Sequence, residues 1–573
     1  MTGILKSAQE LGDVIPNLAV ILKQNAGRYG DKVVYQENKG TGFESVSWTQ
    51  FYQDIRTIAF NLGKFGFSRG EKVAIFSRNR QEMLEIQLAV MASGGVAVPI
   101  FANYPKERAE SLIKHSRANL LALSGQSQLD KIDTELSLSH IFYFDENVDT
   151  SGFENITHFP ELLREKAEAD YDLAFDLAPD TVCLEMFTSG TMSTPKAVRL
   201  MNKNILSQQA ALKILWDINE NDRFLSYLPW HHSFGGIFEL YMALYHGAPL
   251  SLEPSYGKSP ESIMENWKVI KPTVFFSVPK VYQALMTLIS DNPELEDVFF
   301  HPELKFVFTA AAPLPSNISN IFEARNIPVV EGWGLTETSP CCTLTDPSLK
   351  RKPGVVGKPI PGVGLKLSDI NEVLVKGPNV MAGYFDNDEA NADAFTDDGW
   401  FCTGDIGEFT EAGLKLVGRK DRMFKLSNAE KVIPPEIESL ILGKCCYLNY
   451  AVIVGNGEEH PTALLYPNKA LFETQADDAY AGNECVHPSN LENFSHCLEG
   501  CLNQINQQIN TKFARLERVM IVDKELSIEQ NELTPSMKLA VNTVIKHYTA
   551  HIENLYGADN EIDEDVYIVK LKR

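Results

Sequence analysis

Residues 72–100, KVAIFSRNRQEMLEIQLAVMASGGVAVPI, decide the fold class of this chain. Its two ends, 72–76 and 96–100, are short apolar runs typical of buried strands. The stretch between them, 81–92, has the composition of a helix and stops just before a pair of glycines. A strand, a helix and a second strand in this order form a βαβ unit, the building block of a mostly parallel sheet. The sequence therefore predicts an α/β protein.

The composition excludes several classes of protein. The 573 residues are 44% hydrophobic and 22% charged, which is ample for a folded core. The formal net charge of −24 argues against nucleic-acid binding, because phosphates attract a basic excess. Nine cysteines, an odd number, indicate reduced thiols and a cytoplasmic location. No apolar stretch reaches the roughly 20 residues of a membrane span, so the sequence leaves only peripheral membrane contact open.

The pattern of predicted elements divides the chain into two domains. Beyond residue 422 the elements become short: a helix at 436–442, strands at 451–454 and 463–466, and a helix at 502–513. The charged segment Gly418-Arg-Lys-Asp-Arg422 precedes this change. We therefore expect a large N-terminal domain at 1–418, made of several subdomains with mostly parallel sheets and helices. A hinge at 419–421 would follow, and then a small, mobile α+β domain at 422–573 that acts as a lid.

One loop has the chemistry of an anion-binding site. A strand-like run at 182–187 leads into Thr188-Ser-Gly-Thr-Met-Ser-Thr-Pro-Lys196. Its hydroxyls, its glycine and its terminal lysine offer backbone N–H, Oγ and ammonium donors to phosphate oxygens. It is not a Walker A loop, because the G-x-x-x-x-G-K-[ST] pattern is absent. Taken alone, a solvated Ser/Thr turn is the alternative interpretation.

Further motifs follow this loop along the chain. They are Leu228-Pro-Trp-His-His-Ser-Phe-Gly235, Lys271-Pro-Thr-Val-Phe-Phe-Ser-Val-Pro-Lys-Val-Tyr282, Thr309-Ala-Ala-Ala-Pro-Leu314, Glu331-Gly-Trp-Gly-Leu-Thr-Glu337, Gly399-Trp-Phe-Cys-Thr-Gly-Asp405, Gly418-Arg-Lys-Asp421 and Glu532-Leu-Thr-Pro-Ser-Met-Lys538. In this order, and together with the loop, they resemble the signatures of the adenylate-forming superfamily. That superfamily includes acyl-CoA synthetases, luciferases and peptide-synthetase adenylation domains. The resemblance covers about 45–548 and is closest to the long-chain fatty acyl-CoA synthetases.

The resemblance implies two groups of nucleotide-binding residues. The phosphates would be bound by Thr188, Ser189, Gly190, Thr191 and Lys196. The adenine would lie in a pocket formed by Ala311, Ala312, Gly332, Trp333 and Gly334. In that pocket the Trp333 ring would stack on the base, a contact of about 1–3 kcal/mol per base.

The resemblance also implies single roles for five residues around the nucleotide. Thr336 would donate to the α-phosphate, Asp405 would accept from both ribose hydroxyls, and Arg419 would reach ribose or phosphate. His232 would lie beside the carboxylate of the substrate, and Asp421 falls on the position of the hinge.

Catalysis would depend on charge stabilisation. Lys538, in the lid domain, would meet the negative charge that develops at the α-phosphate. Glu337, with Thr191, would hold Mg²⁺, a hard cation that prefers carboxylate and phosphate oxygens. The implied reaction is ATP-dependent activation of a long-chain fatty acid to acyl-adenylate, followed by transfer to CoA. The lid would rotate about the hinge between the two steps.

Two other functions stay open at this point. An acyl-AMP ligase would hand the acyl group to an acyl-carrier protein instead of CoA. A catalytically weak regulatory protein would bind the nucleotide and retain only the fold. The retention of Glu337, Asp405, Arg419 and Lys538 argues against the regulatory alternative.

The chain departs from the family pattern at five positions that bear on these functions. Met192 and Ser193 stand where the phosphate loop usually has Thr and Gly, and Ala197 replaces a glycine. These changes bear on ATP affinity. Ala429 replaces a glycine in the lid loop near the pantetheine channel, so it bears on thioester formation. Gly236 stands where some members carry a tryptophan that gates the acyl site.

Overall fold

A computed structural model gives the fold of most of the chain. It describes residues 3–40, 42–188, 196–310, 314–352, 354–445, 447–469, 472, 488, 490–509, 511–534, 539–556 and 566–571. Several residues predicted for the site lie outside these ranges: Ser189, Gly190, Thr191, Met192, Ser193, Ala311, Ala312 and Lys538.

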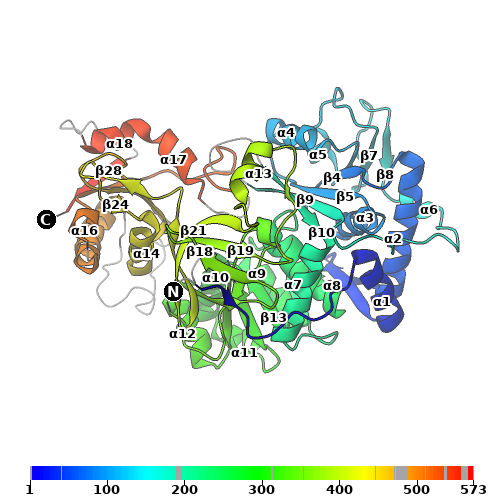
Figure 1. Cartoon of the computed structure of the whole chain (residues 1–573), viewed down its shortest axis with the longest axis horizontal. Coiled ribbons are helices and arrows are strands. Elements are labelled where there is room, and N and C mark those ends of the chain that lie inside the picture. The colour runs from blue at the N-terminus through cyan, green and yellow to red at the C-terminus, as the bar shows by residue number, and fades with distance from the viewer. Residues whose placement is uncertain are drawn as a thin grey trace.

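The large domain contains two sheets whose strands come from distant parts of the chain (Figure 1). The order of the first is β20 (Gly383–Tyr384), β10 (Lys196–Met201), β9 (Val182–Thr188), β5 (Val96–Phe101), β4 (Lys72–Ser77), β6 (Leu120–Leu123), β7 (His140–Tyr143) and β8 (Ile156–His158). The order of the second is β1 (Leu5–Lys6), β18 (Gly364–Leu367), β19 (Glu372–Lys376), β21 (Phe401–Thr410), β22 (Gly413–Arg419), β17 (Val355–Pro359), β16 (Thr343–Leu344), β15 (Val329–Trp333), β14 (Phe306–Thr309), β13 (Val274–Ser277), β11 (Phe224–Ser226), β12 (Leu250–Leu252), β2 (Val33–Asn38) and β3 (Phe43–Ser47).

Helices pack against these sheets (Figure 1). The α-helices are α1 (Leu18–Tyr29), α2 (Trp48–Leu62), α3 (Gln81–Ala92), α4 (Lys106–Ser116), α5 (Gln126–Leu129), α6 (Glu161–Arg164), α7 (Asn202–Leu215), α8 (Leu240–His246), α9 (Pro260–Ile270), α10 (Pro279–Asp291), α11 (Glu296–Phe299), α12 (Ser316–Ala324) and α13 (Asp388–Ala394). Short helical turns are η1 (Gly63–Phe65), the π-helix η2 (Phe234–Glu239), η3 (Pro293–Leu295) and η4 (Thr336–Thr338).

The predicted βαβ unit is confirmed. β4 and β5 run parallel with Lys72 opposite Val96, and α3 connects them. Every residue of α3 from Met83 to Ala92 is buried, as expected of a helix that lies between other elements. The chain is therefore an α/β protein.

The prediction of mostly parallel sheets holds for the first sheet and is wrong for the second. In the first, the strands from β9 to β8 are paired in parallel, and only β10 and β20 are antiparallel at one edge, next to the predicted phosphate loop. In the second, parallel pairing runs from β15 to β2, whereas the strands from β1 to β15 and the β2–β3 pair are antiparallel. Such mixed sheets are common in large α/β folds.

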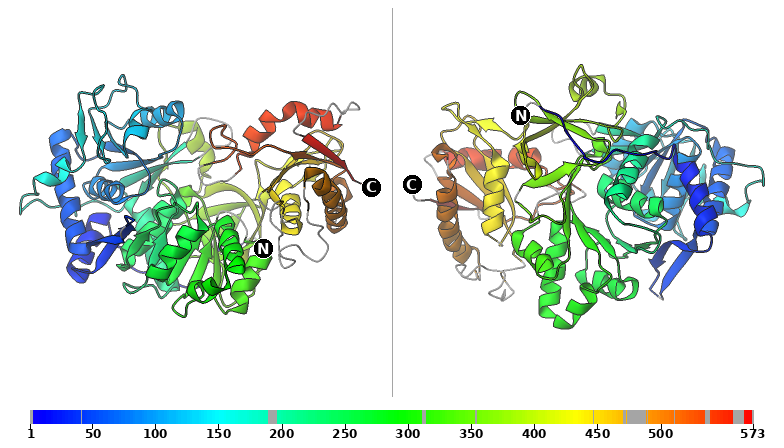
Figure 2. Two further views of the ribbon diagram at one scale, coloured as in Figure 1. Left: turned by 180° about the vertical axis from the view of Figure 1, so that it is seen from behind. Right: turned by 60° about the horizontal axis from the view of Figure 1, so that its bottom comes forward.

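The C-terminal part has its own sheet and its own core (Figure 2). Its strands are β23 (Phe424–Lys425), β24 (Lys431–Val432), β25 (Leu448–Val454), β26 (Thr462–Pro467), β27 (Arg518–Val522) and β28 (Val566–Lys570). Its helices are α14 (Pro434–Lys444), α16 (Leu491–Gln508), the turn η5 (Lys512–Ala514), α17 (Val541–His547) and α18 (Thr549–Tyr556). We call this part the lid.

Alternation along the lid strands assigns helices to opposite faces of the sheet. In β25, Ala451 and Ile453 belong to the core that includes α14 and α16, whereas Val452 and Val454 belong to the core that includes α17 and α18. This two-residue period is the geometry of a strand covered on both faces. The lid is therefore a small α+β layer structure.

The prediction of a lid helix at 502–513 is wrong in its position. The helix α16 runs from Leu491 to Gln508, and Phe513 lies in the separate turn η5. The apolar spacing continues toward the N-terminus from Leu502, and Asn490 caps the helix by accepting a hydrogen bond from the Asn493 N–H.

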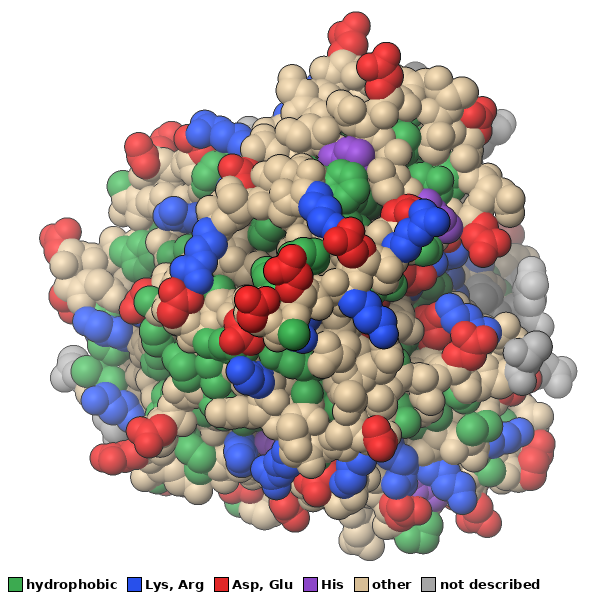
Figure 3. All heavy atoms as spheres, turned by 90° about the vertical axis from the view of Figure 1, so that its right-hand side faces the viewer, with side chains coloured by type: hydrophobic (Ala, Val, Ile, Leu, Met, Phe, Trp, Pro, Cys, Tyr) green, Lys and Arg blue, Asp and Glu red, His purple; other side chains and the backbone are tan. Residues whose placement is uncertain are grey.

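Two surface properties bear on partners. Among the described residues, no helix has the length and apolar character that crossing a membrane requires. Acidic and basic side chains are intermingled on the face that points away from the lid (Figure 3). A nucleic-acid binder would instead gather basic side chains into one stripe.

Candidate active site

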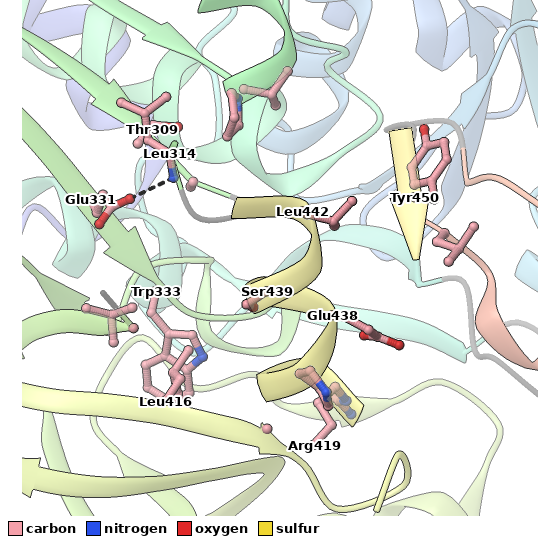
Figure 4. Close-up of a pocket in the computed structure, with 18 of the residues that line it drawn as sticks. Thr309, Leu314, Glu331, Trp333, Leu416, Arg419, Glu438, Ser439, Leu442 and Tyr450 are labelled. Atoms are coloured by element: carbon pink, nitrogen blue, oxygen red, sulfur yellow. Dashed lines mark hydrogen bonds between the residues drawn. The ribbon is translucent and has the colours of Figure 1, made fainter. Parts of the chain in front are cut away.

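A cleft of about 3650 Å³ lies between the large domain and the lid. It is lined by the described residues that the sequence predicts for the site: Thr188, Lys196, His232, Gly332, Trp333, Gly334, Thr336, Glu337, Asp405, Arg419 and Asp421. The lid helix α14 borders the cleft opposite Trp333 (Figure 4).

A chain of polar contacts connects the predicted adenine, ribose and hinge residues. The indole Nε1–H of Trp333 donates to Oδ2 of Asp405 at 2.9 Å. Arg419 donates from Nη1 to Oδ1 of Asp405 at 3.1 Å and from Nε to Oδ1 of Asp421 at 3.0 Å. Because Trp333 and Asp405 are each only 8% exposed, the contact between them is sheltered from water. These four side chains therefore form one connected group.

Glu337 lies close to cationic residues in the same cleft. The Tyr384 hydroxyl donates to its Oε1 at 2.9 Å. Burial raises the pKa of Glu337, and the hydrogen bond from Tyr384 and the charges of Arg419 and Lys196 oppose that rise. The Lys196 ammonium lies 4.9 Å from the centre of the Tyr384 ring. A carboxylate with these neighbours can bind a divalent cation, either alone or together with a phosphate chain.

The two ends of the predicted phosphate loop meet. Thr188 ends β9 and Lys196 begins β10, and the two residues face each other across the antiparallel pair. Ala197 is completely buried opposite Phe187 and is not among the residues with positive φ. An alanine therefore fits where the family usually has glycine. Residues 189–195 lie outside the described part.

His232 and Thr336 come together through the π-helix η2 and its flanking residue Ser233. The Ser233 and Thr336 hydroxyls are 3.0 Å apart, and Nδ1 of His232 accepts from the Phe234 N–H at 3.3 Å. A Cβ on Gly236 would lie 1.8 Å from the carbonyl oxygen of Trp230. No side chain fits there, which explains the missing gating tryptophan.

Close backbone approach explains the glycines that flank Trp333. A Cβ on Gly334 would lie 1.7 Å from the Pro340 carbonyl oxygen, and one on Gly332 would lie 2.6 Å from the Phe308 ring. Glycine at both positions therefore allows the backbone beside Trp333 to lie close to Pro340 and Phe308.

The lid side of the cleft contains the region around the predicted catalytic lysine. Thr534 and Leu539, on either side of the undescribed residues 535–538, both line the cleft. Leu533 and Leu539 themselves form a β-bridge. Ala429 has a φ of 66°, in the left-handed region that favours glycine.

Several residues of the site were missed in the sequence. Tyr384 contacts Glu337 because β20 pairs with β10, so that Tyr384 lies opposite Val198. Glu331 accepts from the Leu314 N–H at 3.1 Å and pairs with Arg351, next to the predicted adenine pocket. No local signal reveals such pairings, because the partners are far apart in the chain.

The fold and the cleft together define a two-domain protein of the adenylate-forming class. Residues 22–385 match the AMP-binding enzyme family, and residues 421–560 match the AMP-binding enzyme C-terminal domain. The chain belongs to the AMP-binding enzyme family.

Relatives of known name extend this assignment. The long-chain-fatty-acid–CoA ligase FadD15 of Mycobacterium bovis is 25% identical, over 95% of this chain and 97% of its own length. The oxalate–CoA ligase of Arabidopsis thaliana is 31% identical, over 66% of this chain and 74% of its own length. The O-succinylbenzoate coenzyme A synthetase MenE of Bacillus subtilis, solved with AMP, has the same fold: its TM-score is 0.71 at 21% identity, covering 92% of this chain and 97% of MenE.

Proposed function

We propose that this protein joins a long-chain fatty acid to CoA at the expense of ATP, which yields acyl-CoA, AMP and pyrophosphate. The observation that carries the proposal is the convergence of Trp333, Asp405, Arg419 and Glu337 on one cleft, with Trp333 and Asp405 in direct contact at 2.9 Å. A chain that kept only the fold would not need these side chains to meet.

The nucleotide would bind along the connected polar group. Its base would lie against the Trp333 ring, and its ribose would lie on Asp405, which Trp333 and Arg419 hold in place. The pairing of Lys196 with the Tyr384 ring orients an ammonium toward the same cleft, where it would steady the phosphates. Ser189, Gly190 and Thr191 would add the donors of the loop.

The residues fit a magnesium ion. Glu337 supplies a hard carboxylate oxygen in the cleft, and Tyr384 fixes the orientation of that carboxylate. Thr191 would supply a second oxygen. When bound, the ion would neutralise charge on the phosphates and on the departing pyrophosphate.

The first half-reaction would then be a displacement at phosphorus. An oxygen of the fatty carboxylate forms a bond to the α-phosphorus, the bond to pyrophosphate breaks, and the acyl-adenylate remains. The Thr336 hydroxyl and the Lys538 ammonium would stabilise the charge that develops on the α-phosphate oxygens. His232 lines the cleft at the position proposed for the carboxylate.

The second half-reaction would require a change of the lid. In our proposal the chain hinges at 419–421, so that 1–418 stays fixed while 422–573 rotates about Asp421 and withdraws Lys538. The CoA thiol then attacks the acyl carbonyl, and AMP leaves with the bonding electrons. A domain rotation thus lets one cleft run two reactions.

An apolar wall supports a hydrocarbon substrate. Phe234, Phe238, Phe308 and Ile318 are among the residues that line the cleft. Rings of Phe238 and Phe308 are 4.7 Å apart, which makes the wall compact. The fatty-acid name of one relative agrees with this wall, whereas the oxalate-specific name of another shows that family membership alone leaves the acid open.

Transfer to an acyl-carrier protein is the second candidate, and one observation favours it. Ala429 holds a left-handed φ of 66° in the lid loop that the family places near pantetheine. A strained loop there would alter the acceptor step and leave adenylation intact. Cys183, Cys341, Cys342 and Cys402 are free thiols, which suits the cytoplasmic location that we include in the proposal.

The test is ATP–pyrophosphate exchange with acids from C2 to C20 and with aromatic acids. We expect exchange to be strongest with long-chain fatty acids. Product mass spectrometry with palmitate, ATP and either CoA or carrier protein then identifies the acceptor. A loaded carrier without acyl-CoA would contradict transfer to CoA, and no exchange with any acid would contradict adenylation itself.

A further inference from the structure

The turn that carries Thr336 and Glu337 has a conformation that its own sequence does not favour. It is the short helical turn η4, and it ends at Ser339 with a φ of 68°. Non-glycine residues rarely adopt this left-handed region, so such a turn persists only when its surroundings hold it. Ser339 is completely buried, and its surroundings are therefore protein.

The Asn379 side chain holds the backbone on both sides of Ser339. Its Nδ2 donates to the carbonyl oxygens of Thr338 at 3.0 Å and Cys341 at 3.3 Å, on either side of Ser339. The Ser339 hydroxyl in turn donates to the Asn379 carbonyl oxygen at 2.9 Å. With the side chain of Asn379 only 1% exposed, these hydrogen bonds are made in the protein interior.

The first turns of α7 hold this arrangement from behind. Asn204 donates from Nδ2 to the carbonyl oxygens of Pro378 at 2.7 Å and Val380 at 2.8 Å, the two neighbours of Asn379. One helical turn later, Oε1 of Gln208 accepts from the Cys341 N–H at 2.7 Å.

The side-chain amides of Asn204 and Gln208 are completely buried. Helix α7 therefore holds the loop at 378–380 through Asn204 and the turn at Cys341 through Gln208.

The same loop also touches Glu337 itself. The Met381 N–H donates to the Glu337 carbonyl oxygen at 2.9 Å, and the Tyr384 hydroxyl donates to its carboxylate. A shift of the 378–384 segment would thus move both the backbone and the carboxylate of Glu337.

We propose that Asn204, Gln208 and Asn379 are positioning residues that set the carboxylate of Glu337 for the divalent cation that accompanies ATP. This inference rests on the proposed function only in the role that it gives to Glu337. Partners behind a metal ligand typically change metal affinity by about 10–100-fold when they are removed. Adenosine, which carries no phosphate and would be bound through Trp333 and Asp405, would not depend on them.

The chain offers a matched control on the same helix. Asn202 is also completely buried, and it also makes two hydrogen bonds: Oδ1 accepts from the Leu18 N–H at 3.1 Å and Nδ2 donates to the Thr181 carbonyl at 3.2 Å. Those bonds tie the start of α7 to the start of α1 and to the residue before β9. Asn202→Ala therefore removes similar contacts without touching the Glu337 turn.

The experiment compares Asn204→Ala, Asn379→Ala and Asn202→Ala with the unmodified protein. We measure Mn²⁺ binding to the ATP-loaded protein by electron paramagnetic resonance, adenosine binding by calorimetry, and Tm. All three variants should lose stability. Asn204→Ala and Asn379→Ala should weaken Mn²⁺ binding about ten-fold and change adenosine affinity less than two-fold, whereas Asn202→Ala should leave both unchanged.

A milder variant keeps the test decisive if these proteins fold poorly. Gln208→Met keeps the volume of the side chain and removes only the acceptor for Cys341, and it should weaken Mn²⁺ binding about three-fold. Equal Mn²⁺ affinity in the Asn202, Asn204 and Gln208 variants would overturn the inference. Mn²⁺ bound normally by a protein that exchanges no pyrophosphate would instead count against the proposed function.

Discussion

The two sides of the cleft differ in how firmly they hold their functional side chains. On the large domain, Trp333, Asp405 and Glu337 are each 8% exposed, and each is hydrogen-bonded to another side chain. At the junction with the lid, the side chains of Arg419 and Asp421 are 43% and 44% exposed. In the proposed function, these well-held side chains form a nucleotide platform, and the more exposed junction lets the lid change position between the two half-reactions.

The largest effect on the rate of the reaction is expected from removal of the lid lysine. We expect Lys538→Ala to slow ATP–pyrophosphate exchange about 1000-fold, because the proposed function assigns to this ammonium the charge that develops at the α-phosphate. Conversion of preformed acyl-adenylate to acyl-CoA should stay within about three-fold of normal, because the proposed rotation withdraws the lysine before that step. Rapid-quench assays of each half-reaction measure both rates.

The control is Lys512→Ala, which removes an exposed lysine from the same domain. It should leave both rates unchanged. Equal losses of the two half-reactions in Lys538→Ala would contradict the two positions of the lid.

On the platform side, Asp405→Asn should give the next largest effect. Asparagine has no charge and only one acceptor oxygen, so it cannot accept from Trp333, Arg419 and the ribose hydroxyls together, and AMP affinity should fall about 30-fold. Calorimetric titration with AMP measures the change.

A pair of Trp333 variants then separates the two roles of that residue. Trp333→Phe keeps a ring and loses only the N–H donor, so its affinity for AMP should fall about five-fold. Trp333→Ala loses the stacking as well and should fall further. Equal affinities in the two variants would show that the ring does not stack on adenine.

The sequence predicts the platform better than its supports. Trp333, Asp405 and Arg419 were recognised because each belongs to a local motif, and the structure brings them together. Tyr384 and Asn379 were not recognised, since their importance depends on pairing with segments that lie elsewhere in the chain. Composition and spacing within a segment do not encode such partners.

The lid illustrates a second limit of prediction from sequence. Its short strands at 451–454 and 463–466 were found from apolar runs and correspond to β25 and β26. The start of α16 was placed too late, although the apolar spacing continues through Leu498 and Phe494. A periodic pattern alone leaves such a boundary open, and the cap at Asn490 sets it.

The rate of pyrophosphate exchange should depend on pH through the ionisation of Glu337. The Tyr384 hydrogen bond favours the charged form of this carboxylate, so Tyr384→Phe should raise the pKa of Glu337 further above its ordinary value. Cation binding needs the ionised form. The variant should thus match the unmodified protein at about pH 8 and exchange pyrophosphate about three-fold more slowly at about pH 6.

The free energy of unfolding should fall as pH rises, whereas pyrophosphate exchange by Tyr384→Phe should become faster. Because the folded protein holds the Glu337 proton more tightly than the unfolded chain, the contribution of this group to the free energy of unfolding falls as pH rises through its raised pKa. Denaturant titrations between pH 5 and 8, as an approximate range, measure that trend. A rate ratio of Tyr384→Phe to unmodified protein that stays constant with pH would contradict the role of the hydrogen bond.

The smallest effect is expected at Ala429, on the lid side. Its left-handed φ of 66° costs an alanine about 1 kcal/mol, and glycine relieves that strain at some cost in chain entropy. Ala429→Gly should therefore raise the free energy of unfolding by about 0.5 kcal/mol. It should leave pyrophosphate exchange unchanged and speed the acceptor step about two-fold.

A second alanine of the lid provides the opposite outcome as a reference. Ala550 is exposed in the helix α18, where glycine is unfavourable, so Ala550→Gly should lower the free energy of unfolding by about 1 kcal/mol. Denaturant titration of both variants measures the contrast. If Ala429→Gly destabilised the protein as much as Ala550→Gly does, the strain at Ala429 would not exist in solution, and the lid loop would offer no reason to expect an acceptor other than CoA.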